Sequence, residues 1–226
     1  AFAGNHKCLL SWKLDGLTVV LTYERGELVK AVTRGNGYIG EVITANARTF
    51  KNLPTRIAYQ GRLVIRGEAI ITYSDFEKIN AQIAGESGKY KNPRNLCSGS
   101  VRQLNSGITA KRNVRLKAFA LISAVDTQTG EPDVDFENSK EVQFNWLKAQ
   151  GFDTVDFRVV DEKNMAESVE YFAKEVEKND FPSDGLVLTY DNISYGESLG
   201  RTAKFPRHSI AFKWNISVIS HAAFVV

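Results

Sequence analysis

Lys13-Leu14-Asp15-Gly16 stands directly before the alternating run Leu17-Thr18-Val19-Val20-Leu21-Thr22-Tyr23. A period of two is typical of a half-buried strand, so we expect the lysine at a strand end. A lysine becomes a nucleophile when burial or a neighbouring cation lowers its pKa, and glycine lets a backbone approach a phosphate closely. We expect Asp15 on the same strand face as Lys13, where it could hold the amine and a metal in register. Taken alone, these four residues favour a solvated strand-end lysine over a nucleophile.

Three further blocks place charged residues beside predicted strands. They are Arg66-Gly67-Glu68 between Leu63–Ile65 and Ala69–Ile71, Asp184-Gly185 before Leu186–Leu188, and Lys204-Phe205-Pro206-Arg207 before Ile210–Trp214, which contains Lys213. Each charged residue could separately be a surface salt-bridge partner. Their order in glycine-flanked blocks favours a common site for phosphate chemistry.

Longer strings make the pattern specific. They are Thr33-Arg34-Gly35-Asn36-Gly37 followed by Gly40-Glu41, and Asn92-Pro93-Arg94-Asn95 followed by Gly99–Leu104 and Ile108-Thr109-Ala110. With the ordered Lys, Glu, Asp and Lys blocks, they closely resemble the adenylation domain of bacterial NAD-dependent DNA ligases. The resemblance runs from about Lys13 to Trp214.

Irregularly spaced strands and helices predict an α+β fold with antiparallel sheets. The resemblance implies the nucleotidyltransferase fold of DNA ligases and capping enzymes, with the sheets flanking a nucleotide cleft. Expected strands are 17–23, 28–33, 63–72, 116–125, 156–160, 185–190 and 209–214; expected helices are 41–48, 74–84 (capped by Ser74), 95–104, 139–150 and 164–178.

The resemblance assigns roles to individual residues. Lys13 attacks the α-phosphate of NAD, forms lysyl-AMP and releases nicotinamide mononucleotide; AMP then passes to the 5′-phosphate of a DNA nick. Catalytic residues are Lys13, Asp15, Glu68 and Lys213; nucleotide-binding residues are Leu14, Gly16, Arg34, Glu68, Phe119, Asp184 and Lys213; DNA-phosphate residues are Arg94, Arg102 and Arg112. Mg²⁺ is expected near Asp15, Glu68 and Asp184, directly or through water, because it prefers oxygen ligands and phosphates.

Two departures from the family pattern fall near the expected adenine edge. Ser11 stands where the family usually has Glu, and Thr189 stands where it has Lys. Two hydroxyls thus replace a charged pair, which affects base recognition rather than phosphate chemistry. His208 stands where the family often has Trp, and we expect it to be a surface or packing residue rather than an acid or base.

Charge is unevenly distributed along the 226 residues, although the net charge is only +3. Eight Lys or Arg and no acid occur between Ser87 and Val125, whereas fifteen acids and six bases occur between Glu131 and Asp184. The basic stretch predicts contact with a polyphosphate or a nucleic-acid backbone. Two distant cysteines, Cys8 and Cys97, predict reduced thiols in a cytoplasmic protein, and no stretch is apolar enough for a membrane span.

Residues 1–226 read as one adenylation domain of a longer ligase. The resemblance implies an N-terminal nicotinamide-recognition module and a C-terminal OB-fold outside it, with nicked double-stranded DNA as the partner of the full-length protein and a monomeric state. Two alternatives stay open: an ATP- or GTP-dependent RNA ligase or capping-type nucleotidyltransferase, and a non-catalytic nucleic-acid-binding relative.

Overall fold

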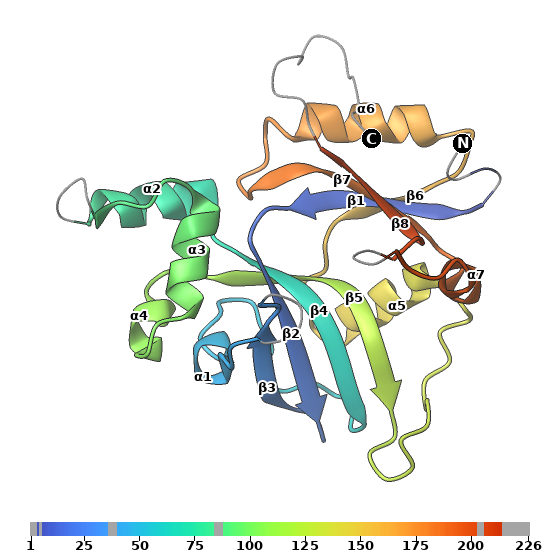
Figure 1. Cartoon of the computed structure of the whole chain (residues 1–226), viewed down its shortest axis with the longest axis horizontal. Coiled ribbons are helices and arrows are strands. Elements are labelled where there is room, and N and C mark those ends of the chain that lie inside the picture. The colour runs from blue at the N-terminus through green and yellow to red at the C-terminus, as the bar shows by residue number, and fades with distance from the viewer. Residues whose placement is uncertain (1–3, 5, 36–39, 84–87, 203–205, 214–226) are drawn as a thin grey trace.

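Two four-stranded antiparallel sheets form the framework of this computed structural model, which describes residues 4, 6–35, 40–83, 88–202 and 206–213 (Figure 1). The β1 sheet has the order β6 (Phe157–Val160), β1 (Cys8–Leu14), β7 (Ser183–Tyr190) and β8 (Ser209–Lys213). The β2 sheet has the order β3 (Glu27–Thr33), β2 (Leu17–Glu24), β4 (Arg62–Ile70) and β5 (Arg115–Val125). The expected α+β fold with antiparallel sheets is confirmed.

Helices cover the sheets and join their strands. They are α1 (Thr44–Ala47), α2 (Tyr73–Ala81), α3 (Pro93–Val101), α4 (Ser106–Ala110), α5 (Lys140–Ala149), α6 (Met165–Glu175) and α7 (Ile193–Ser198). Figure 1 shows α6 along the outer side of the β1 sheet, α2 to α4 grouped at one side, and α5 beside β5.

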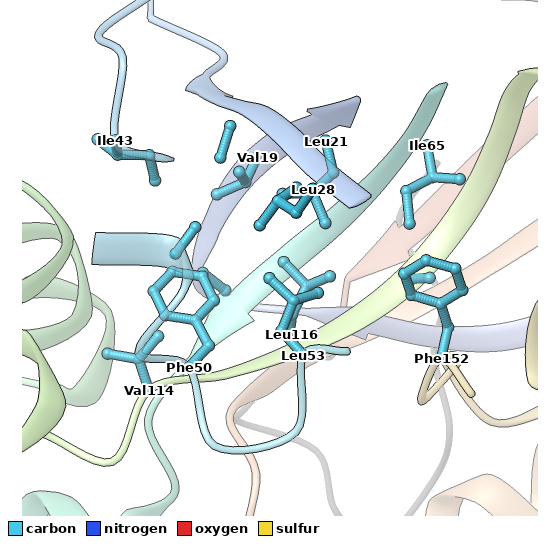
Figure 2. Packing of buried hydrophobic residues seen from close by; sticks show 14 of the residues in the cluster. Val19, Leu21, Leu28, Ile43, Phe50, Leu53, Ile65, Val114, Leu116 and Phe152 are labelled. Carbon is cyan, nitrogen blue, oxygen red and sulfur yellow. The ribbon is translucent and has the colours of Figure 1, made fainter. Parts of the chain in front are cut away.

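The larger core lies on one face of the β2 sheet. Alternate residues of β2, such as Val19 and Leu21, are fully buried there with Ile65 of β4. Figure 2 shows Phe50 and Phe152 packed into the same cluster. The period of two therefore buries one face of β2 and leaves Thr18 and Val20 on the other.

A second core lies between the β1 sheet and α6. Trp12 of β1 and Phe172 of α6 meet edge to face at 4.7 Å, and Leu186 of β7 is fully buried beside them. Since neighbouring strand residues point to opposite faces, burial of Trp12 directs Lys13 to the other face of the sheet.

The segment Lys13–Gly16 connects the two sheets, and this corrects one expectation. β1 ends at Leu14 and β2 begins at Leu17, so Asp15 and Gly16 form the link between strands of different sheets. Asp15 is therefore not on a strand face shared with Lys13. The strand β1 was itself missed, because its partners β6 and β7 lie far along the chain.

Arg66-Gly67-Glu68 lies inside the continuous strand β4, which confirms the strand expected at 63–72. Expectations about the helices change. Helix α2 begins one residue early and is capped by Thr72, whose side chain accepts a hydrogen bond from the Asp75 N–H. Ser74 instead donates its hydroxyl to Asp180, and α4 and α7 were not predicted.

Candidate active site

Lys13 and Lys213 share one carboxylate, Asp184. The Lys13 Nζ donates to Asp184 Oδ1 at 2.5 Å, and the Lys213 Nζ lies 3.4 Å from Asp184 Oδ2. About a quarter of the Lys13 and Asp184 side chains is exposed, whereas Lys213 is mostly exposed. The arrangement leaves two amines next to each other and accessible to an anionic substrate.

Strand register produces this arrangement. Lys13 lies opposite Gly185 of β7, and Gly185 lies opposite Lys213 of β8. The middle position must be glycine, since a Cβ there would lie 1.8 Å from the Phe212 carbonyl oxygen. The Asp-Gly block thus supplies a carboxylate and the space that lets the strands pair closely.

Glu68 lies on the other side of the link between the sheets and is 9% exposed. Its carboxyl oxygens accept hydrogen bonds from the Gly16 N–H at 3.1 Å and from the Thr18 hydroxyl at 2.9 Å. Burial raises the pKa of Glu68 to about 7, although these bonds and the charges of Arg94 and Lys13 oppose the shift. The carboxyl is therefore poised to gain or lose a proton near neutral pH.

Gly16 holds the Glu68 side in place. A Cβ at Gly16 would lie 2.0 Å from the Ala69 carbonyl oxygen on β4. Its N–H bonds to Glu68, so the same residue fixes the spacing of β2 and β4 and donates to the carboxylate. Glycine is required here for close backbone approach.

Asp15 projects toward the helix α3 rather than along β1. Its carboxylate accepts a hydrogen bond from Arg94 Nη1 at 2.7 Å, and its N–H bonds to the Pro182 carbonyl at 2.9 Å. Arg94 also interacts electrostatically with Glu68 and with Asp184. It therefore belongs to the group of charged residues around Lys13.

A direct three-carboxylate metal site does not fit this arrangement. Within the described ranges, no three His, Cys, Asp or Glu side chains come close enough to hold one ion. Asp184 faces two amines, Asp15 faces Arg94, and Glu68 is bonded to Gly16 and Thr18. Mg²⁺ was expected to bind these carboxylates directly or through water. Contact through water or a substrate phosphate suits their positions, and direct binding by all three does not.

Two arginines that were not predicted, Arg66 and Arg201, lie near the predicted Arg34, and Arg66 shares a face of the β2 sheet with Glu68. Thr18 pairs with Glu68, Val20 pairs with Arg66, and the Arg34 N–H bonds to the Thr18 carbonyl. Burial lowers the pKa of Arg66, and the charges of Arg34 and Arg201 lower it further. In the described part of the chain these arginines form no ion pair, so the cluster is open to an anion.

The remaining predicted residues are less closely tied to Lys13. Arg102 pairs with Glu41 at 2.5 Å, and Arg112 has a buried Nη1 with no hydrogen-bond partner among the described residues. Phe119 of β5 is 36% exposed, and Leu14 ends β1. Their proposed contacts with DNA phosphate or nucleotide stay predictions.

Ser11 and Thr189 lie on neighbouring strands of the β1 sheet. Ser11 is opposite Val187, and Thr189 is opposite Leu9, so both hydroxyls share the Lys13 face of the sheet. The Ser11 hydroxyl reaches the Val187 carbonyl at 3.5 Å. Both side chains are uncharged, so the Glu and Lys of the family pattern are replaced by hydroxyls at these two positions.

Cys97 is fully buried, whereas His208 is only partly buried. The Cys97 thiol bonds to the Ala69 carbonyl at 3.2 Å, and burial raises its pKa. His208 packs against Gly196, where an added Cβ would lie 2.9 Å from the His208 Cβ. Burial and nearby Lys140 and Arg201 lower the His208 pKa.

A hollow of about 380 Å³ lies on the opposite face of β1 from Lys13 and does not form part of this site. Trp12, Phe172 and Asn179 line it, together with residues of β6 and α6. Trp12 faces away from Lys13, so the hollow is separated from the two amines by the β1 sheet.

Comparison with known proteins matches this chain to one family. Residues 2–217 match the NAD-dependent DNA ligase adenylation domain. A DNA ligase of Lachnoclostridium phytofermentans is 64% identical over 93% of this chain and 31% of its own length, and a DNA ligase of Mycoplasmopsis agalactiae is 38% identical over 92% and 30%. A chain of the Pnkp1/Rnl/Hen1 complex shares the fold at a TM-score of 0.50 and 15% identity, over 94% of this chain and 68% of its own.

The chain spans about a third of the length of the DNA ligases it matches. No helix in its described ranges has both the length and the apolar character needed to cross a membrane. The family match covers nearly the whole chain, including the Lys13, Glu68, Asp184 and Lys213 blocks. This chain therefore belongs to the NAD-dependent DNA ligase adenylation domain family.

Proposed function

We propose that this chain carries out nucleotidyl transfer for a DNA ligase, with Lys13 as the nucleophile and NAD as the AMP donor. The observation that carries the proposal is that two amines pair with Asp184. The buried Glu68 belongs to the same site, because its carboxyl accepts a hydrogen bond from Gly16, three residues after Lys13. A phosphate bound here would lie near the nucleophile Lys13, the second cation Lys213 and the acid Glu68.

The reaction forms one bond and breaks one. The Lys13 Nζ loses a proton and attacks the α-phosphorus, a phosphoramidate N–P bond forms, and the P–O bond to nicotinamide mononucleotide breaks. Asp184 holds the amine before attack, and Lys213 offers positive charge to the phosphoryl oxygens. Glu68, whose pKa is about 7, is placed to bond a ribose hydroxyl or a water in either protonation state.

The arginines supply a second binding surface. Arg34, Arg66 and Arg201 are open cations that lie near one another, and Arg94 lies beside Asp15. Guanidinium groups bind phosphate through two parallel hydrogen bonds. We assign Arg34 to the nucleotide, and Arg94, Arg102 and Arg112 to the DNA phosphates.

Mg²⁺ is expected to enter with the substrate. Mg²⁺ usually keeps several waters and is bound by one or two carboxylates together with phosphates. Asp15, Glu68 and Asp184 offer carboxylate oxygens that would contact the ion through water. When bound, the ion would neutralise charge on the phosphoryl oxygens.

DNA sealing is proposed for the full-length ligase, with this chain as its adenylation domain. Nicked double-stranded DNA would be the partner, and the AMP would pass to its 5′-phosphate. A monomeric, cytoplasmic protein remains our expectation. Support for the division of labour is that this chain matches only about a third of its DNA ligase relatives.

Mass spectrometry of the full-length ligase after exposure to NAD and Mg²⁺ tests the proposal. The protein should gain one AMP on Lys13 and release nicotinamide mononucleotide, and ATP should not replace NAD. Lys13→Ala should lose all labelling, because no other amine occupies that position. Lys174→Ala is the matched control, since Lys174 forms an exposed ion pair with Glu170 on α6, which packs on the face of the β1 sheet opposite Lys13.

Two results would contradict the proposal. AMP carried by ATP alone would favour an RNA-ligase or capping-type reaction. A protein that binds duplex DNA but never forms a lysyl adduct would favour a non-catalytic nucleic-acid-binding role.

A further inference from the structure

The hollow of about 380 Å³ on the far face of β1 from Lys13 is large enough for a small organic molecule. Four aromatic side chains line it: Trp12 of β1, Phe157 of β6, and Tyr171 and Phe172 of α6. Trp12 and Phe172 are buried, whereas Tyr171 is 46% exposed. The aromatic walls therefore suit a flat aromatic ligand that enters beside Tyr171.

Three charged side chains also line the hollow, and each already has a partner outside it. Asp156, Arg158 and Glu175 form ion pairs with N···O distances of 3.6, 3.5 and 2.9 Å, respectively. The Arg158 guanidinium also lies over the Tyr171 ring, 4.6 Å from its centre. Two carboxylates and one guanidinium give the lining an excess of negative charge, which disfavours an anionic ligand.

Asn179 differs from these three because its side-chain amide is unsatisfied. Its Nδ2 is buried and has no hydrogen-bond partner among the described residues, and the residue lines the hollow. The backbone around it is held in place, since the Asn179 N–H bonds to the Glu175 carbonyl at 3.1 Å and the next residue, Asp180, accepts hydrogen bonds from Ser74. A buried amide donor without a partner is costly, so an oxygen acceptor brought by a ligand would be stabilising here.

We propose that this hollow binds a neutral, planar aromatic carboxamide. The aromatic rings of the ligand pack against Trp12, Phe157 and Tyr171, and its carbonyl oxygen accepts a hydrogen bond from the Asn179 amide. A carboxamide also carries an N–H group that can donate to the Glu175 carboxylate, which a carboxylic acid in its ionised form lacks.

This site goes beyond nucleotidyl transfer and does not depend on it. Trp12 and Lys13 are neighbours in β1 and point to opposite faces of the sheet. A ligand in the hollow would therefore contact the strand that carries the nucleophile without competing for the nucleotide site.

Ligand-observed NMR of the full-length ligase with naphthalene-2-carboxamide tests the site. We expect a dissociation constant of about 1 mM or below. Excess AMP together with nicotinamide mononucleotide should not displace the probe. Two analogues should bind about tenfold more weakly: naphthalene-2-carboxylate, which meets the carboxylates of the lining, and decahydronaphthalene-2-carboxamide, which has no aromatic ring.

Two variants locate the probe. Asn179→Leu keeps the size of the side chain and removes the amide, so it should weaken naphthalene-2-carboxamide about tenfold. Urea unfolding should show unchanged or higher stability for this variant, because the lost amide had no partner among the described residues. Tyr171→Leu removes one aromatic wall at an exposed position and should weaken the probe by a similar factor.

Asn145→Leu is the matched control for Asn179→Leu. Asn145 is an exposed residue of α5 that does not line the hollow, so this variant should bind the probe as the unmodified protein does. Thermal unfolding identifies any variant that fails to fold, and Tyr171→Leu then tests the site without Asn179→Leu.

Four results would overturn the inference. They are no binding of naphthalene-2-carboxamide at millimolar concentration, its displacement by the two nucleotides, an affinity that neither Asn179→Leu nor Tyr171→Leu lowers, and equal binding of the amide and the carboxylate. None of them bears on AMP attachment to Lys13, which is measured separately.

Discussion

The Lys13 side and the Glu68 side of the site neutralise their charges by different means. Lys13 and Lys213 both form ion pairs with Asp184 at strand ends that are exposed to different degrees. Glu68 is buried, and its direct partners are a backbone N–H and a hydroxyl rather than a cation. The ion pairs on the Lys13 side can therefore rearrange, whereas the hydrogen bonds on the Glu68 side hold the carboxyl in one position.

This difference suits the two tasks of the site. An exposed ion pair contributes little to stability, so its members can change partners when a phosphate arrives. A buried carboxyl held by Gly16 depends on the close spacing of β2 and β4. We therefore expect substitutions on the Glu68 side to change stability, and substitutions on the Lys13 side to change activity.

Gly16→Ala should produce the largest change in stability. Its Cβ would lie 2.0 Å from the Ala69 carbonyl oxygen, so β2 and β4 must separate and the bond to Glu68 is strained. We expect a loss of about 3 kcal/mol or more in the free energy of unfolding, measured with urea. Gly107→Ala in α4 is the control, because its nearest neighbour is the adaptable side chain of Asn105. A fully stable Gly16→Ala protein would show that the link is not rigid.

Glu68→Gln should change how stability depends on pH. The folded carboxyl has a pKa of about 7, above its ordinary value of 4.5. Its contribution is complete below pH 4.5 and is lost as the pH rises through 7, because the folded state then must bury a charge. Between pH 5 and pH 8 we expect the unmodified protein to lose on the order of 2 kcal/mol more than Glu68→Gln.

Urea unfolding of both proteins at several pH values measures this difference. Glu167→Gln, an exposed change on α6, should follow the unmodified protein. Parallel curves for the unmodified protein and Glu68→Gln would mean that Glu68 stays ionised throughout, and would remove its proposed role near neutral pH.

Asp184→Asn should have the smallest effect on stability and a clear effect on activity. The carboxylate is partly exposed, so its ion pairs are worth less than about 1 kcal/mol in unfolding. Losing the group that positions Lys13 should slow AMP attachment about tenfold, as followed by mass spectrometry over time. Glu170→Gln, which breaks the exposed pair with Lys174, should change neither. A large loss of stability in Asp184→Asn would contradict the contrast between the two sides.

Local patterns predicted the local structure well. The helix expected at 139–150 forms α5: Ser139 caps it, accepting a hydrogen bond from the Val142 N–H, and Gly151 follows the helix with a φ of 92°. The strands expected at 17–23 and 28–33 form β2 and β3, which are joined at Arg25 and Gly26, both with positive φ. These features depend on neighbours within a few residues, which a sequence displays directly.

Long-range features were missed for the opposite reason. The strand β1 pairs with residues more than 140 positions away, and its register alone brings Lys13 beside Asp184. Arg66 and Arg201 lie 135 positions apart but act on each other electrostatically, and no local pattern links them. Asp15 was misplaced because the end of β1 was not visible before its partners were known.

By itself, the sequence determined the chemistry available to this protein: a lysine, an acid and phosphate-binding residues in ordered blocks, together with the local elements that hold them. Only the tertiary structure decided that Lys13-Leu14-Asp15-Gly16 joins two sheets, which separates Asp15 from Lys13 and buries Glu68 against Gly16. The physical reason is range: helix caps and turns are set by adjacent residues, whereas strand pairing and burial depend on segments that only folding brings together.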